Sequence, residues 1–374
     1  MLYTASLTLL ALITSAGLAV SGVGSPLAVA HLAFAVGVVP LIFAAISHFV
    51  PVLTRTGNPS LLIRRLPPLA QGAGLLVVAA MQGLIPYGLL HLAATVDIVL
   101  AIILLRWIFG RTKSTLGSPH PGWRWYGAAI VCLILALTAV LLMSVFPDNW
   151  RALRSFHLHL NSIGLVGLAA LGTLPVLLPT AMSKPDPEAA GWLRRRLWIV
   201  AGGAVMLAMG TAIRWEFATP GAALVMVVAL GLIGHWGRRF GFRQLFVDGV
   251  TTSLTLAVIG LVLALASGVA HGAGFISARA SLLAWGVGFL LPLITGTLSQ
   301  LLPVWRWPGP IIPARPIMRQ KLAATGSLRA CLWLFAALAI FAEFQVLAAV
   351  LLVLGLFLFV IGLVQAMRVT RSTR

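Results

Sequence analysis

The sequence predicts an all-α, polytopic membrane protein with twelve transmembrane helices. Of its 374 residues, 60% are hydrophobic and only 9% are charged, whereas a soluble domain carries roughly 25% charged residues. Its mean hydropathy is +1.04, and its apolar runs of about 18 residues or more can cross a hydrocarbon core about 30 Å thick. These observations exclude a soluble enzyme, a disordered chain and a fibrous repeat.

Each predicted span is bounded by charged residues, by glycine and proline clusters or by tryptophan. The tightest connections fall at 86–88 and 214–216, where consecutive helices must be joined by a very short turn. The first run lacks the basic start of a signal peptide, so we expect it to remain as a span. The twelve predicted spans are 2–22, 28–54, 68–86, 89–110, 125–147, 155–181, 197–214, 217–237, 247–269, 279–303, 327–344 and 346–368.

The basic residues predict the orientation of the chain. All but four of the 26 lysine and arginine residues fall in alternate gaps between the spans or in the C-terminal tail; the four others are Arg151, Arg154, Arg214 and Arg279. Basic loops stay in the cytoplasm, so we expect both termini to be cytoplasmic. The net charge of +19 is then a topology signal, aided by anionic membrane lipid, and predicts no nucleic-acid partner.

Spans two, six and ten share a sequence pattern. The segments 31–51, 159–179 and 283–303 each reach a proline twenty residues after their predicted outer end, and Gly164 matches Gly288 in this register. Recurrence every four spans predicts three four-helix units of the same topology. The alternative is that glycine and proline are simply common in membrane helices.

The predicted repeat units cover about 1–115, 116–243 and 244–374. Because four spans return the chain to the side from which it started, the three units share one orientation. They would form a single integral membrane domain over 1–374, with the units arranged around a pseudo-threefold axis.

Five of the eight histidines gather at the predicted outer ends of the spans: His31, His91, His157, His159 and His271. Ionisable side chains in a bilayer are costly and usually face the interior of the helix bundle, and neutral imidazole is the commonest protein metal ligand. His31 and His159 occupy matching places in two repeat units, so we expect both to face the same kind of cleft. The sequence therefore predicts a metal or haem site there, or alternatively a hydrogen-bonded polar layer.

His157 and His91 belong to the same predicted outer group. His157 and His159 are separated by about 200° around a regular helix, so both reach one centre only if the helix start is irregular. His157 shares a helix face with Asn161.

Asp97 is the only acidic residue well inside a predicted span. Such a residue is a candidate for proton or ion handling or for pairing with a buried cation. A hydrogen bond to a neighbouring helix explains it equally well.

Two segments carry a resemblance to a known family. They are 31–58, ending in HFVPVLTRTGN, and 157–180, reading HLHLNSIGLVGLAALGTLPVLLPT. With twelve helices in three units of four, they resemble subunit I of the haem–copper oxidases. They are more similar to the NnrS-type membrane proteins, which contain haem and copper and are linked to the response to nitric oxide.

The resemblance implies one haem b or one copper ion, held by His31 and His159 with His157 and His91 as alternates. It also implies a place in the bacterial inner membrane and a role in nitric-oxide or metal stress or in electron transfer. The oxidases carry a His-x-His pair on helix ten, where this chain reads GTLSQLLP, and a His-His pair on helix seven, where it reads WIVAGGAVMLAMG. A complete oxygen-reducing centre is therefore not expected.

Two other functions are compatible with the sequence. A secondary transporter often has twelve spans and would use Asp97, although it normally needs more intramembrane charge. An accessory membrane subunit would use the histidines only for packing. Membrane lipid is the expected partner, and a redox partner or quinone is a further possibility; the sequence leaves the oligomeric state and any turnover open.

Overall fold

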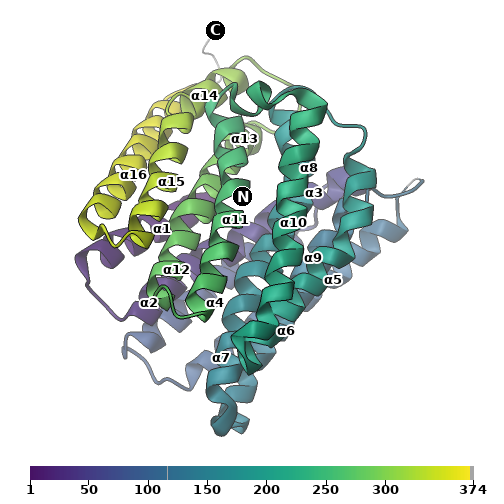
Figure 1. Cartoon of the computed structure of the whole chain (residues 1–374). Coiled ribbons are helices and arrows are strands. Elements are labelled where there is room, and N and C mark those ends of the chain that lie inside the picture. Colours follow the sequence, from purple (N-terminus) through teal and green to yellow (C-terminus); the bar gives the residue numbers. More distant parts are fainter. Residues whose placement is uncertain (116, 371–374) are drawn as a thin grey trace. The chain divides into compact units, whose positions relative to one another are not determined.

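A computed structural model describes residues 1–115 and 117–370 of the chain, and in this part it is helical with no strand (Figure 1). Twelve helical segments are long and apolar enough to cross a membrane. The predicted all-α, twelve-span membrane architecture is therefore confirmed. The tail arginines Arg371 and Arg374, which contribute to the predicted orientation, lie outside the described residues.

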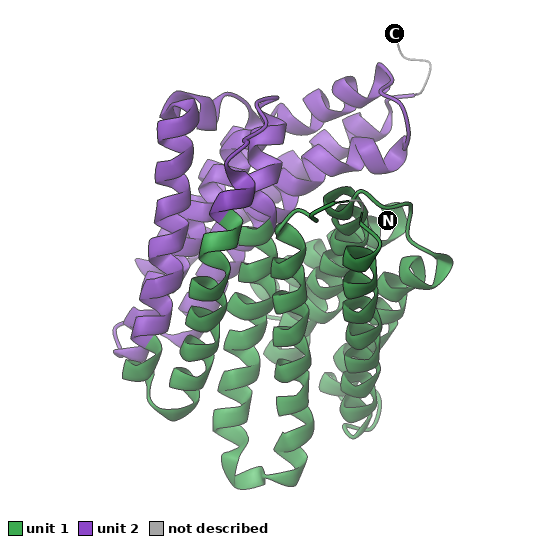
Figure 2. Cartoon of the chain, turned by 90° about the vertical axis from the view of Figure 1, so that its right-hand side faces the viewer, with its two compact units in different colours: residues 1–172, 193–218 green, residues 173–192, 219–374 purple. Residues whose placement is uncertain are grey.

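The chain forms two compact units, which are coloured separately in Figure 2. The first unit comprises Met1–Gly172 and Leu193–Ala218, and the second comprises Thr173–Trp192 and Thr219–Arg374. These boundaries differ from those of the predicted repeat units.

The first unit begins with the helices of five spans. They are α1 (Leu2–Ser21), α2 (Pro26–His31), η1 (Leu32–Val38), α3 (Val39–Thr54), α4 (Leu61–Met81), α5 (Leu89–Lys113) and α6 (Gly122–Val145), followed by η2 (Pro147–Asn149), α7 (Trp150–His159) and η3 (Leu160–Gly167). Three helices then divide between the units: α8 (Leu168–Ala181), α9 (Ala189–Ile213) and α10 (Trp215–Phe240).

The remaining helices belong to the second unit. They are η4 (Phe242–Phe246), α11 (Gly249–Gly272), α12 (Ala278–Trp285), η5 (Gly286–Leu290), α13 (Leu291–Arg306), α14 (Ala314–Ala323), α15 (Gly326–Phe341) and α16 (Gln345–Met367). Asp248 starts α11 with a side chain that accepts hydrogen bonds from the backbone N–H groups of Val250 and Thr251. This cap satisfies donors that the first turn of a helix leaves unpaired.

The prediction for the third span was wrong in its boundaries. Helix α4 covers Leu61–Met81, whereas the apolar run predicts 68–86. The helix continues through Pro67 and Pro68, because a membrane helix tolerates proline and flanking arginines can extend to the headgroup region. Gly83, with a φ of 74°, lies in the turn that follows the helix, inside the predicted span.

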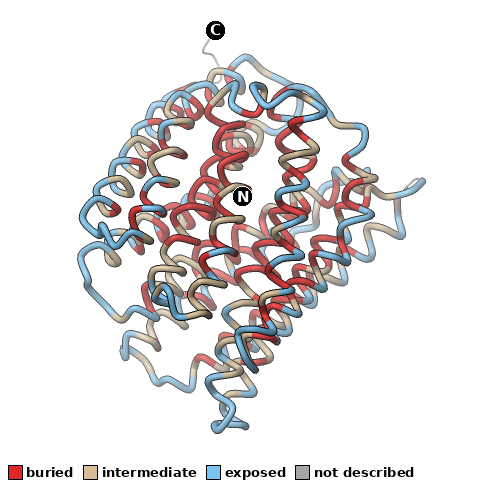
Figure 3. Tube along the Cα trace, viewed as in Figure 1, coloured by how far each residue is buried: buried red, intermediate tan, exposed pale blue. Residues whose placement is uncertain are grey.

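Burial is concentrated in particular spans. More than half of the most apolar stretch is buried in spans two, six, nine and ten, and less than half in every other span. Figure 3 shows the contrast within the second unit, where α11 and α13 are mostly buried and α16 is buried at only a few positions. Spans two, six and ten, which carry the shared sequence pattern, are thus largely interior.

The same three spans each contain a π-helical segment, in which hydrogen bonds reach one residue further back than in an α-helix. These segments are η1, η3 and η5. In the register that aligns His31 with His159, all three lie at corresponding positions along their spans. The segments η1 and η3 begin directly after His31 and His159. The wider turn of the π-helix therefore sets the direction of each histidine relative to the helix that follows.

Candidate functional site

The structure brings His31 and His157 together in the first unit. Their ring centroids are 6.5 Å apart and the ring planes differ by 17°. His31 is the last residue of α2, and His157 lies in the last turn of α7. Both side chains are half-buried, so two segments far apart in sequence present imidazoles to one place.

A backbone carbonyl group orients each of these two rings. Nδ1 of His31 lies 2.8 Å from the carbonyl oxygen of Leu27, and Nδ1 of His157 lies 2.9 Å from that of Ala136. A carbonyl oxygen can only accept, so each Nδ1 carries the hydrogen and each Nε2 keeps its lone pair. This is the arrangement in which a histidine binds a metal through Nε2.

The described residues place no hydrogen bond on Nε2 of His31 or His157. The side-chain amide of Asn161 lies beside His157: its Nδ2 donates to the backbone oxygen of His157 over 2.9 Å and lies 3.3 Å from Nδ1 of the ring. The Oδ1 atom of Asn161 is buried and without a hydrogen-bond partner. An acceptor beside the histidine pair is thus left for a group that donates a hydrogen bond.

His159 makes the same internal hydrogen bond as His31. Its Nδ1 donates to the carbonyl oxygen of Ser155 over 2.8 Å, four residues back, as His31 does to Leu27. The hydroxyl oxygen of Thr211, on α9, lies 3.1 Å from the same Nδ1 and shares its hydrogen. The matching positions predicted for His31 and His159 thus correspond to matching local geometry, while the ring that meets His31 is that of His157.

The other two histidines predicted to lie at outer span ends also have Nδ1 near a backbone carbonyl oxygen. Nδ1 of His91 lies 3.3 Å from the carbonyl oxygen of Gly88, and Nδ1 of His271, in the second unit, lies 3.0 Å from that of Ile276. Nδ1 of His120 instead accepts from the backbone N–H of Gly122 over 3.3 Å, and burial lowers the pKa of this loop histidine.

The described residues contain no group of three or more histidine, cysteine, aspartate or glutamate side chains that could hold one metal ion. A site at His31 and His157 would therefore rely on two imidazoles. The stacked His31 and His157 rings, with centroids 6.5 Å apart, are the two imidazoles that the structure brings side by side.

Asp97 lies on the buried face of α5 and is 6% exposed. Its Oδ1 atom has no hydrogen-bond partner, and none of the ion pairs between described residues involves it. The alternative explanation of Asp97 is a hydrogen bond to a neighbouring helix. Among the described residues, Oδ1 of Asp97 makes no such bond.

Sequence reasoning missed Thr211 and the carbonyl group of Ala136. A hydroxyl in an apolar span carries no sequence signal, and every residue has a backbone carbonyl. Only the packing of α6 and α9 against span six reveals that these two groups orient histidines.

Neither the models of known protein families nor the curated proteins contain a match to this chain.

Proposed function

We propose that this protein is an integral membrane protein that holds one copper ion or the iron of one haem b through His31 and His157. It resembles the NnrS-type proteins in its histidine-bearing spans and would act in the response to nitric oxide or metal stress, or in electron transfer. Its place would be the bacterial inner membrane, with both termini in the cytoplasm.

The single observation that carries this proposal is the approach of the His31 and His157 rings to 6.5 Å. Both rings keep Nε2 available, since both Nδ1 atoms are bonded to backbone carbonyl groups. Imidazole suits copper and iron alike, and two axial histidines are a common way to hold a haem that transfers electrons.

The two imidazoles of His31 and His157 are ligands that suit either a copper ion or a haem iron. A copper ion needs little more than the two nitrogen atoms. A haem b would also need space for its macrocycle beside the two imidazoles, and His31 and His157 would be the residues that hold its iron. When bound, either group would supply one-electron redox chemistry, and His31 and His157 would orient it.

The test is metal analysis and an absorption spectrum of the full chain purified in detergent. We expect one copper per chain without a Soret band, or one haem b per chain with one. His31→Ala and His157→Ala should each lower the metal or haem content at least tenfold, because each removes half of the ligands. His120→Ala is the matched control and should keep the wild-type content, since His120 lies in a loop and uses Nδ1 as an acceptor.

The His159→Ala and His91→Ala variants distinguish the alternate ligands. If the pair is His31 with His157, both variants keep the metal. If the His159→Ala variant loses the metal or haem and the His157→Ala variant keeps it, His159 is the ligand in place of His157. Wild-type protein that elutes as a single folded species with neither copper nor haem would reject the proposal and leave the transporter or accessory-subunit function.

A further inference from the structure

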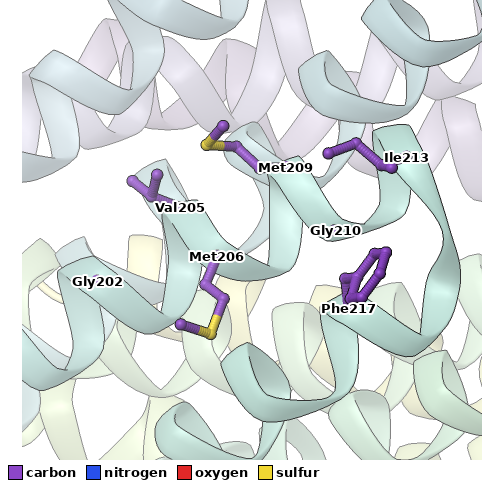
Figure 4. A pocket seen from close by; sticks show the side chains of 7 residues that line it. All are labelled: Gly202, Val205, Met206, Met209, Gly210, Ile213 and Phe217. Carbon is purple, nitrogen blue, oxygen red and sulfur yellow. The ribbon is translucent and has the colours of Figure 1, made fainter.

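An apolar groove of about 380 Å³ runs along one face of α9 in the first unit (Figure 4). The groove is shallow and open; its lining extends from Gly202 to Ile213 on α9 and includes Phe217 near the start of α10. Met206 and Met209 supply much of its wall and are exposed at the surface of the span. Methionine side chains are flexible and adapt to irregular apolar partners.

The length of the groove matches one leaflet of a bilayer. Eleven helical steps separate Gly202 from Ile213, which correspond to about 16 Å at 1.5 Å per residue. Half of a hydrocarbon core about 30 Å thick is about 15 Å. A transmembrane helix of a partner protein would contact α9 along the whole thickness of the membrane. The groove covers only about half of that thickness, so its length favours one acyl chain of a lipid.

The end of the groove at Ile213 and Phe217 carries a pair of opposite charges. The guanidinium of Arg214 lies 3.0 Å from the carboxylate of Glu216, and both side chains are exposed. The backbone N–H of Arg214 donates to the carbonyl oxygen of Gly210 and that of Phe217 donates to the carbonyl oxygen of Arg214, so the turn that carries the pair is ordered directly beside Ile213 and Phe217 of the groove. Exposed ion pairs contribute little to stability, and this one can open to bind other charged groups.

We propose that this groove binds one zwitterionic phospholipid that carries a primary ammonium group, of the phosphatidylethanolamine type. One of its two acyl chains lies between Gly202 and Ile213, and the other stays in the surrounding bilayer. The phosphate accepts hydrogen bonds from the Arg214 guanidinium, and the ammonium donates to the Glu216 carboxylate. The inference is independent of the metal site.

Gly202 offers a way to fill the groove without disturbing the fold. A Cβ atom added at Gly202 meets no other atom within 4 Å, and the same holds at Gly231 on α10, outside the groove. Gly202→Phe therefore places a ring in the position of the acyl chain, and Gly231→Phe is its matched control.

The experiment is native mass spectrometry of the delipidated full chain titrated with defined phospholipids. We expect one phosphatidylethanolamine per wild-type chain, with affinity at least tenfold lower in Gly202→Phe and unchanged in Gly231→Phe. Phosphatidylglycerol lacks the ammonium and phosphatidylcholine has no N–H donor, so both should bind at least fivefold more weakly. Glu216→Gln should remove this preference, and Arg214→Gln should weaken all three lipids.

Four results would overturn the proposal. Equal affinity in Gly202→Phe and Gly231→Phe would show that the lipid does not use the groove. A wild-type chain that ignores the headgroup, or that carries a prenyl quinone in place of phospholipid, would assign the groove to another apolar molecule. A dimer that Gly202→Phe dissociates would assign the groove to a second copy of the chain.

Discussion

The hydrogen bond on Nδ1 determines what each histidine can bind. His31 and His157 donate from Nδ1 to carbonyl groups and keep Nε2 available. His235 shows the opposite arrangement, because its Nε2 lies 2.7 Å from the buried carboxylate of Asp186. The first arrangement suits metal binding, whereas the second ties a side chain of α10 to the loop before α9.

Asp97 gives a prediction at the residue scale. A buried carboxyl group without a cation or a set of donors is far less costly as the neutral acid than as the ion. We therefore expect the apolar reagent dicyclohexylcarbodiimide, which modifies protonated carboxyl groups in membranes, to label Asp97 once per chain. Peptide mass spectrometry after proteolysis gives the modified position.

The Asp97→Asn variant is the control for this labelling, since it keeps the shape of the side chain and removes the acid. It should lose the modification while keeping its elution profile and metal content. Labelling that persists in Asp97→Asn, or a wild-type chain that does not react at all, would contradict a proton-handling role for Asp97. Substrate uptake that depends on Asp97 in metal-free protein would favour a transporter.

At the scale of elements, the π-helical segment η1 depends on close packing from its neighbours. The hydroxyl of Thr8 donates to the carbonyl oxygen of Gly37 over 2.9 Å. Nε2 of Gln71 donates to the carbonyl oxygen of Val36 over 3.4 Å. Gly74 on α4 lies so near that a Cβ atom there would sit 2.4 Å from the carbonyl oxygen of Ala35. The wide turn is therefore held in place by α1 and α4.

This packing predicts different outcomes for two glycines of the same helix. Gly74→Ala must push α4 away from η1, at a cost of about 1–3 kcal/mol for overpacking, and should displace His31. Gly72→Ala meets nothing within 4 Å and should be neutral. Thermal unfolding in detergent and metal content measure both effects; equal behaviour of the two variants would show that η1 does not need this contact.

The predicted spans and the candidate spans among the described residues agree in number because membrane thickness imposes a length that hydrophobicity reveals directly, whereas the starts of α4 and α9 lie seven to eight residues before their predicted positions. Local chemistry near the ends is harder to infer: at Arg64, Arg65, Pro67 and Pro68 the sequence suggests a boundary, whereas α4 runs through all four. The π-helical segments have no sequence signature either, since they depend on contacts from other helices.

The site could be predicted only in part for the same reason. The clustering of histidines at one end follows from span counting and charge. The choice between His157 and His159 as the neighbour of His31 depends on how span six is rotated, which η3 and the packing of α6 determine. The 3.6 residues per turn of a regular helix do not predict this rotation, because a π-helical segment changes it.

At the scale of the whole molecule, we propose that the three π-helical segments mark a threefold internal repeat. They occur in spans two, six and ten at matching positions. In each case the preceding long helix packs against the segment: α1 against η1, α6 against η3 and α11 against η5. A π-helical segment at the same position is expected if the second helix of each repeat unit bends in the same way.

The repeat and the charge distribution together predict one topology, which cysteine labelling can test. In a chain whose native Cys132 and Cys331 are replaced by alanine, single cysteines at Leu84 and Phe275 should react with a membrane-impermeant maleimide in intact cells. Both positions are exposed, in the turns after α4 and α11. Six of the candidate spans, an even number, lie between these two turns, so both turns should reach the same outer side.

The matched inner positions are Phe242 and Ile311, which are equally exposed and lie after α10 and α13. Cysteines there should react only after the membrane is permeabilised, because the arginines that follow keep these loops in the cytoplasm. Reversal at all four positions would invert the chain and move the His31–His157 pair to the cytoplasmic side. Reaction of Leu84 and Phe275 from opposite sides would mean an odd number of crossings between them, and the threefold repeat would then be untenable.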